Sequence, residues 1–251
     1  MIKKNSSLIK LKIKQFVPKT ILNSFRRIYR RSLWKGKIRI FCISMQRSGT
    51  TSVSDFFKSF GYPTLSDNKK LTRYWSKCWY EGDFETIFKS KEFLSYQVFE
   101  DNPWWNPDFY KVLYHRFPNS KFILMDRDSN DWFNSMLSLT DGKTLGNTKR
   151  HCKVYRRELE FYQNLDFNED FKPKDLEVDN LMELKGFEEQ YKSIYELHNR
   201  EVIDFFKKKD PNSFFYSSLN DKNKWTELGK FLGIEVPKDF EIHSNRSNKK
   251  I

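Results

Sequence analysis

The chain has 251 residues, which is enough for one α/β domain with a complete hydrophobic core. Its formal net charge is +13, but residues 1–37 contain twelve Lys or Arg and no acidic residue, which leaves 34 basic and 33 acidic residues in 38–251. Because the basic and acidic residues of 38–251 nearly cancel, the composition argues against a nucleic-acid-binding protein. Such a protein would carry its basic face on the folded domain. We therefore expect a basic N-terminal arm, 1–37, and a single domain, 38–251.

The cysteines and the apolar segments indicate a reduced, cytoplasmic environment. Cys42, Cys78 and Cys152 are an odd number and lack the spacing of a zinc or redox site. The sequence contains no run of 18 or more apolar residues, and its N-terminus lacks the pattern of a secretory signal. We expect no membrane-spanning helix, although peripheral attachment to a membrane stays open.

The N-terminal arm contains a basic amphipathic pattern that starts at Ile21. Apolar residues occur at positions 21, 22, 25, 28, 29 and 33, and the arginines at 26, 27, 30 and 31 lie largely on the other side of such a helix. This pattern is typical of helices that bind an anionic membrane surface. It also fits a helix packed on the domain with a solvated basic rim, and a transit-type sequence is a third interpretation.

Residues 38–60 predict a strand, a small hydroxyl-rich turn and a helix. The apolar run 38–43 is typical of a buried strand. Val53, Phe56, Phe57 and Phe60 then follow helical spacing. A turn between a strand and a helix directs backbone N–H groups and the positive end of the helix at an anion. A Ser/Thr-rich helix cap with an incidental arginine is the simpler alternative.

This turn differs from a nucleotide-triphosphate loop. When the pattern is aligned on Gly49, Ser44 takes the position of the first glycine and Thr50 that of the lysine. The cation stands two residues before the glycine, at Arg47. The candidate anion-binding residues are Arg47, Ser48, Gly49, Thr50, Thr51 and Ser52.

Acidic residues follow a second predicted strand, 95–99. Glu100 and Asp101 come directly after it and precede Pro103. Because ligands of open parallel sheets lie at the carboxyl ends of the strands, these carboxylates are placed for acid–base chemistry. We expect Asp101 first and Glu100 second as the base, with a helix cap or an ion pair as the alternative.

The remaining segments complete a three-layer α/β fold with a central parallel sheet of four to five strands. We expect strands at 121–126 and 213–216, the first leading into Arg127 and a helix that contains Ser135. Further helices are expected at 107–117, 148–162, 187–207 and 225–232, and residues 62–94 are expected to be irregular. Two tryptophans, Trp104 and Trp105, either stack on a sugar ring or are buried anchors, and His151 is expected at the surface.

Taken together, these motifs resemble the sulfotransferases that use 3′-phosphoadenosine 5′-phosphosulfate. The resemblance covers residues 38–245 and rests on Arg47 to Ser52, on Arg127 with Ser135, and on the pattern from Trp225 to Pro237. It implies a P-loop-like fold, a 5′-phosphate held by the Arg47–Ser52 turn and a 3′-phosphate held by Arg127 and Ser135. It also implies in-line transfer of a sulfuryl group without a metal, with Asp101 or Glu100 as the base.

Some features depart from this family or leave its details open. Gln46 and Asp126 stand where other residue types are usual, and Asp126 either pairs with Arg127 or faces away from it. Tyr195 and His198 match a family pattern with either a structural or a donor-binding role, and the segment 243–246 is expected near the donor. The acceptor is expected to be a glycan, a glycolipid or a small alcohol.

Two other functions remain as alternatives. The segment 122–126 resembles a strand that ends in a magnesium-binding aspartate, as in P-loop kinases, although Thr50 replaces their lysine. A non-catalytic scaffold that attaches to membranes through residues 1–37 is the other alternative.

Overall fold

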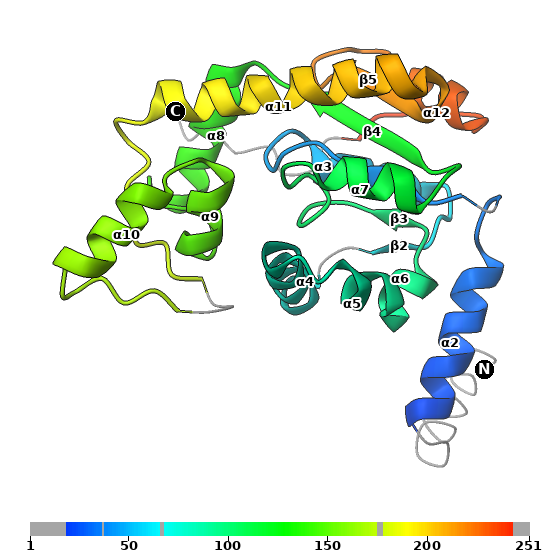
Figure 1. The fold of residues 1–251 in the computed structure, drawn as a ribbon. Coiled ribbons are helices and arrows are strands. Elements are labelled where there is room, and N and C mark those ends of the chain that lie inside the picture. Colours follow the sequence, from blue (N-terminus) through cyan, green and yellow to red (C-terminus); the bar gives the residue numbers. More distant parts are fainter. Residues whose placement is uncertain (1–18, 37, 66–67, 175–177, 243–251) are drawn as a thin grey trace, which may run out of the picture.

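A five-stranded parallel sheet forms the centre of the molecule. The computed structural model describes residues 19–36, 38–65, 68–174 and 178–242 (Figure 1). All neighbouring strands in the order β2-β3-β1-β4-β5 run parallel, which confirms the predicted α/β fold with four to five strands. The strands are β1 (Ile40–Cys42), β2 (Thr64–Leu65), β3 (Val98–Phe99), β4 (Lys121–Asp126) and β5 (Phe214–Ser218).

Helices connect the strands and surround the sheet (Figure 1). Within the described ranges, none of them is long and apolar enough to cross a membrane. They are α2 (Lys19–Ser32), α3 (Thr50–Ser59), α4 (Lys69–Glu81), α5 (Phe84–Lys89), α6 (Lys91–Ser95), α7 (Phe109–Arg116), α8 (Ser129–Thr140), α9 (Thr148–Val154), α10 (Glu158–Phe167), α11 (Glu188–Lys209), the 3-10 turn η1 (Pro211–Ser213) and α12 (Lys224–Leu232).

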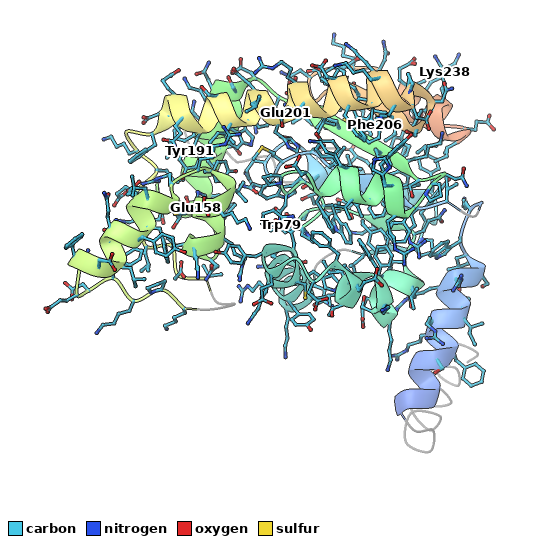
Figure 2. All side chains as sticks on the ribbon, viewed as in Figure 1. Trp79, Glu158, Tyr191, Glu201, Phe206 and Lys238 are labelled. Atoms are coloured by element: carbon cyan, nitrogen blue, oxygen red, sulfur yellow. The ribbon has the colours of Figure 1, made fainter. Side chains whose placement is uncertain are left out.

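Alternating side chains of the strands build two separate cores, one on each face of the sheet. On β4, Phe122 and Leu124 pack in the core that includes α7 and α11, whereas Ile123 and Met125 pack in the core that includes α3 and α12. Successive residues of a strand point to opposite faces, so each face is covered by its own helices. Figure 2 shows Phe206 of α11 on the first face, and its ring lies 4.7 Å from that of Phe122. The predicted three layers are therefore present.

The segment 62–94 was predicted to be irregular, and this prediction is wrong. It contains strand β2 and helices α4, α5 and most of α6. The caps of α4 are regular, because the Asn68 side chain accepts a hydrogen bond from the Leu71 amide and Gly82 ends the helix with a φ of 77°. Aromatic residues on several sides of α4 hid this periodicity, since Trp75 is core whereas Tyr74 is exposed.

Two other boundaries differ from the prediction. The strand expected at 95–99 starts at Val98, because Ser95 is the last residue of α6. The helix expected at 148–162 is two helices, α9 and α10, separated at Arg156, which has a φ of 56°. The next side chain, Arg157, is buried and donates to the Glu183 carbonyl at 2.6 Å, so a tertiary contact favours the break.

The topology fixes where a ligand site can form. The chain runs from β1 to β2 and β3 on one side of β1, and then returns to β4 and β5 on the other side. In open parallel sheets, ligands bind beyond the carboxyl ends of the strands at such a reversal. The loops after β1 and β4 therefore meet at the expected position of a site.

The aromatic core under β1 generates a stability prediction. Phe41 is fully buried, and its ring centre lies 5.5 Å from that of Phe99 and 5.6 Å from that of Phe122. We expect Phe41→Ala to lower the free energy of unfolding by about 3–5 kcal/mol, measured by urea denaturation. The matched control is Phe167→Ala, because Phe167 is 86% exposed and its loss should cost no more than ~0.5 kcal/mol. Equal effects of the two substitutions would contradict this account of the core.

Candidate functional site

The loop between β1 and α3 has a backbone that only certain residues tolerate. Gly49 is the N-cap residue of α3 and has a φ of 84°. A residue with a Cβ atom at this position would have a strained φ, and that atom would lie 2.5 Å from Cδ1 of Leu219, which would have to move. Arg47 also has a left-handed backbone, with a φ of 70°. Such conformations are rare outside glycine and are concentrated at functional sites.

The two predicted anion-binding motifs are in direct contact. Arg47 Nε donates to Ser135 Oγ at 2.9 Å, across 88 positions of sequence. An Nη atom of Arg127 donates to the Arg47 carbonyl oxygen at 3.3 Å. The pKa of Arg47 is lowered, first by its burial and then by the positive charge of Arg127. Two guanidinium groups held together in this way, beside the N-terminus of α3, favour a bound anion.

Tyr195 of α11 joins the loop between β1 and α3 to the strand end that precedes Arg127. Its hydroxyl lies 3.1 Å from Ser48 Oγ, accepts from the Arg127 amide at 2.9 Å and donates to Asp126 Oδ1 at 3.0 Å. Burial raises the pKa of Tyr195, so the hydroxyl keeps its proton. Nearby, Nε2 of His198 lies 3.0 Å from the Ile43 carbonyl oxygen. Both residues therefore make structural contacts that fix the shape of the loop.

Asp126 is turned into the fold, away from the Arg127 guanidinium. Its Oδ1 also accepts from the Arg127 amide at 2.7 Å and from Asn199 Nδ2 at 2.8 Å. Its Oδ2 accepts from the Tyr216 hydroxyl at 3.0 Å. The carboxylate thus ties β4 to α11 and β5. Of the two orientations that the sequence left open, pairing with Arg127 or facing away from it, Asp126 therefore has the second.

Ser48 differs from the expectation that it binds the anion. Its side chain is fully buried and bonds to Tyr195, and its amide donates to the Met45 carbonyl at 3.3 Å. Its hydroxyl and its amide are therefore both bonded inside the protein. Ser48 shapes the loop, and the other loop residues face the cleft.

Both predicted acidic residues stand at the end of β3. Asp101 has a left-handed backbone, with a φ of 66°. Burial raises the pKa of its carboxyl above the ordinary value of 3.8, and a hydrogen bond from the Asn102 amide partly opposes this rise. Trp104 and Trp105, which follow, are 1% and 3% exposed and belong to the core. They are buried anchors, so the sugar-stacking interpretation is not supported for them.

One cleft of about 1790 Å³ unites these residues. Helix α4 lines it with side chains at helical spacing, including Lys69, Arg73 and Ser76. Trp79, labelled in Figure 2, follows one turn later and lines the cleft too. Of the predicted site residues, all but Ser48 line the cleft: Arg47, Gly49, Thr50, Thr51, Ser52, Glu100, Asp101, Arg127 and Ser135.

His151 was predicted at the surface, and this prediction is wrong. The residue is 5% exposed and lines the cleft from α9. Its Nε2 lies 2.7 Å from the Tyr191 hydroxyl, and the Leu145 amide donates to its Nδ1 at 3.1 Å. Burial lowers the pKa of His151 to about 3, so the ring is neutral at physiological pH. Contacts with Leu145, with the ring of Tyr155 and with the distant Tyr191 accompany its burial.

In the part of the chain that the structure describes, no group of three or more His, Cys, Asp or Glu side chains is arranged to hold a metal ion. Residues 243–246, which were expected near the donor, lie outside the described residues.

Comparison with known proteins identifies the family of this chain. Among solved structures, a "Sulfotransferase Domain from the Curacin Biosynthetic Pathway" matches with 12% identity and a TM-score of 0.40, over 80% of this chain and 75% of that one. No curated protein matches. The family model described as "Sulfotransferase domain" matches residues 39–249, which is most of the chain. The chain therefore belongs to the sulfotransferase family of enzymes.

Proposed function

We propose that this sulfotransferase moves a sulfuryl group from 3′-phosphoadenosine 5′-phosphosulfate to a hydroxyl of a glycan or glycolipid. The observation that carries the proposal is the contact of Arg47 with both Ser135 and Arg127 at the carboxyl ends of β1 and β4. A donor with phosphates at two positions needs two adjacent cationic sites, and this pair of motifs supplies them.

The residues of the cleft fit the two phosphates of such a donor. Arg127 and Ser135 combine a fixed guanidinium with a hydroxyl, which suits the 3′-phosphate. Arg47, the N-terminus of α3 and the hydroxyls of Thr51 and Ser52 suit the 5′-phosphate. The bound donor supplies an activated sulfuryl group and a phosphate leaving group. The role of Arg47 is then to stabilise the negative charge that grows on the leaving phosphate oxygen.

The carboxylates at the end of β3 supply the base. As the acceptor oxygen attacks sulfur, Asp101 takes the hydroxyl proton, and the bond from sulfur to the phosphate oxygen breaks with its electron pair left on that oxygen. Burial raises the pKa of Asp101, which makes its carboxylate a stronger base than an exposed one. Glu100 lines the same cleft and is the alternative base.

The wall of the cleft that α4 forms favours a polar acceptor. The α4 face that lines it carries Lys69, Thr72, Arg73 and Ser76. Hydroxyl and cationic side chains at this spacing suit the many hydroxyls of a sugar better than an apolar alcohol.

Kinase activity is the alternative that the geometry supports less. A magnesium-binding aspartate needs accessible carboxylate oxygens, whereas both oxygens of Asp126 accept hydrogen bonds from protein groups. Thr50 also stands where a kinase loop carries its lysine.

The donor proposal predicts metal-independent nucleotide binding. Isothermal titration of the protein with 3′-phosphoadenosine 5′-phosphate, without magnesium, should give tight binding. Arg127→Ala should weaken it by about 2–5 kcal/mol, because a charge-assisted contact is lost. The control is Arg116→Ala, which removes an arginine from an exposed ion pair with Glu85. Binding of ATP with magnesium and not of the bisphosphate would overturn the proposal in favour of a kinase.

The pKa of Asp101 predicts the pH dependence of the reaction. Since the base must be deprotonated, activity should fall as the pH drops through a pKa that lies above 3.8. Asp101→Asn should lower kcat by about 10²–10⁴-fold and leave bisphosphate affinity unchanged. Glu100→Gln is the matched control, measured over the same pH range. A larger loss in Glu100→Gln, with the acidic limb retained in Asp101→Asn, would transfer the role of base to Glu100.

The network around Asp126 predicts a positioning role for Tyr195. Tyr195→Phe removes the hydroxyl that contacts Ser48 and the Arg127 amide, so bisphosphate affinity should fall by about tenfold. Tyr216→Phe removes one hydrogen bond to Asp126 without touching the loop, and its affinity should stay near that of the wild type. Titration of both variants with the bisphosphate measures the effect on positioning, and their urea denaturation measures the effect on stability. Equal losses of affinity would assign Tyr195 a merely structural role.

A further inference from the structure

Helix α2 contacts the domain through its basic side. Arg27 and Arg30 are its half-buried residues among those whose side chains are described, and the Arg30 guanidinium lies 4.6 Å from the centre of the Tyr96 ring. The chain after the helix is fastened by Trp34, whose Nε1 donates to the Ser95 carbonyl at 3.0 Å. The Lys35 amide donates to the side chain of Gln97 at 2.9 Å. The helix therefore has a defined orientation against the end of α6.

The opposite side of α2 presents large apolar residues to the outside. Phe25 is 66% exposed, Ile28 63%, Tyr29 65% and Leu33 41%. Their spacing of three and four residues forms one continuous stripe along the helix. An amphipathic helix that served only to cover the domain would bury this stripe. Figure 1 shows α2 (blue) extending away from the sheet and its covering helices.

The charges beside the stripe indicate what that partner is. Arg26 and Arg31 are exposed and border it, and residues 1–37 contain no acidic residue. The sequence before the helix adds Lys3, Lys4, Lys10, Lys12 and Lys14. A second copy of this arm would bring like charges together, whereas anionic lipid headgroups complement them.

We propose that α2 binds an anionic membrane surface, with Phe25, Ile28 and Tyr29 inserted at the boundary between headgroups and acyl chains. Arg26 and Arg31 then contact the headgroups, while Arg30 keeps the helix against the domain. The attachment is independent of the chemistry in the cleft. It holds the enzyme at the surface where lipid-linked acceptors are found.

Co-sedimentation of the full chain with vesicles tests this binding. We expect it to bind vesicles of phosphatidylcholine with phosphatidylserine and to bind phosphatidylcholine alone at least tenfold more weakly. Phe25→Ser combined with Ile28→Ser should reduce partitioning by about tenfold or more, because apolar surface no longer enters the bilayer. Phe167→Ser combined with Leu159→Ser is the matched control, since both residues are exposed on α10.

A second pair of variants tests the charges. Arg26→Glu with Arg31→Glu should abolish the preference for phosphatidylserine, whereas Lys207→Glu with Lys208→Glu on α11 should retain it. Far-ultraviolet circular dichroism and bisphosphate titration report whether each variant is folded. Equal binding to both vesicle types, or binding unchanged by the Phe25 and Ile28 substitutions, would overturn the proposal. A dimer that these substitutions dissociate, without vesicle binding, would assign the stripe to a second copy.

Discussion

The site depends on holding two arginine side chains together at the ends of two parallel strands. Arg47 and Arg127 repel each other, which contributes to the lowered pKa of Arg47. The pairing of β1 with β4 brings them together, and the Arg47 carbonyl and Ser135 accept hydrogen bonds from the two guanidinium groups. The fold thus maintains a concentration of positive charge at this edge of the sheet before any ligand arrives. On the proposed function, this charge is preorganised for the phosphates of the donor.

A layer of protein contacts behind the cleft keeps this charge in place. Asp126 and Tyr195 connect β4, β5, α11 and the loop between β1 and α3 through hydrogen bonds. Asp126 is the last residue of β4, and its negative charge would weaken anion binding if it faced the cleft. Because Asp126 is satisfied by amide, amide side-chain and hydroxyl donors, its charge is used for structure and the guanidinium of Arg127 stays directed at the ligand site.

Two candidate site residues have left-handed backbones, a conformation that non-glycine residues outside the site, such as Arg156, also adopt. Arg47 and Asp101 have left-handed backbones, which cost about 1–2 kcal/mol for residues with a Cβ atom. They lie at the ends of β1 and β3, where the chain leaves the sheet. The well-packed aromatic cores on both faces of the sheet stabilise the molecule enough to retain these conformations.

Local patterns in the sequence determined the strand at 121–126 and the strand–turn–helix around Gly49, and they selected nine residues that line one cleft. These features depend on periodicity and on residue types at short spacing. The helices in 62–94, the break at Arg156 and the burial of His151 could not be predicted, because contacts between distant segments decide them. The same holds for the inward orientation of Ser48. Only the tertiary structure decided which side of α2 faces outward, since an amphipathic pattern defines two faces but not which of them meets the domain.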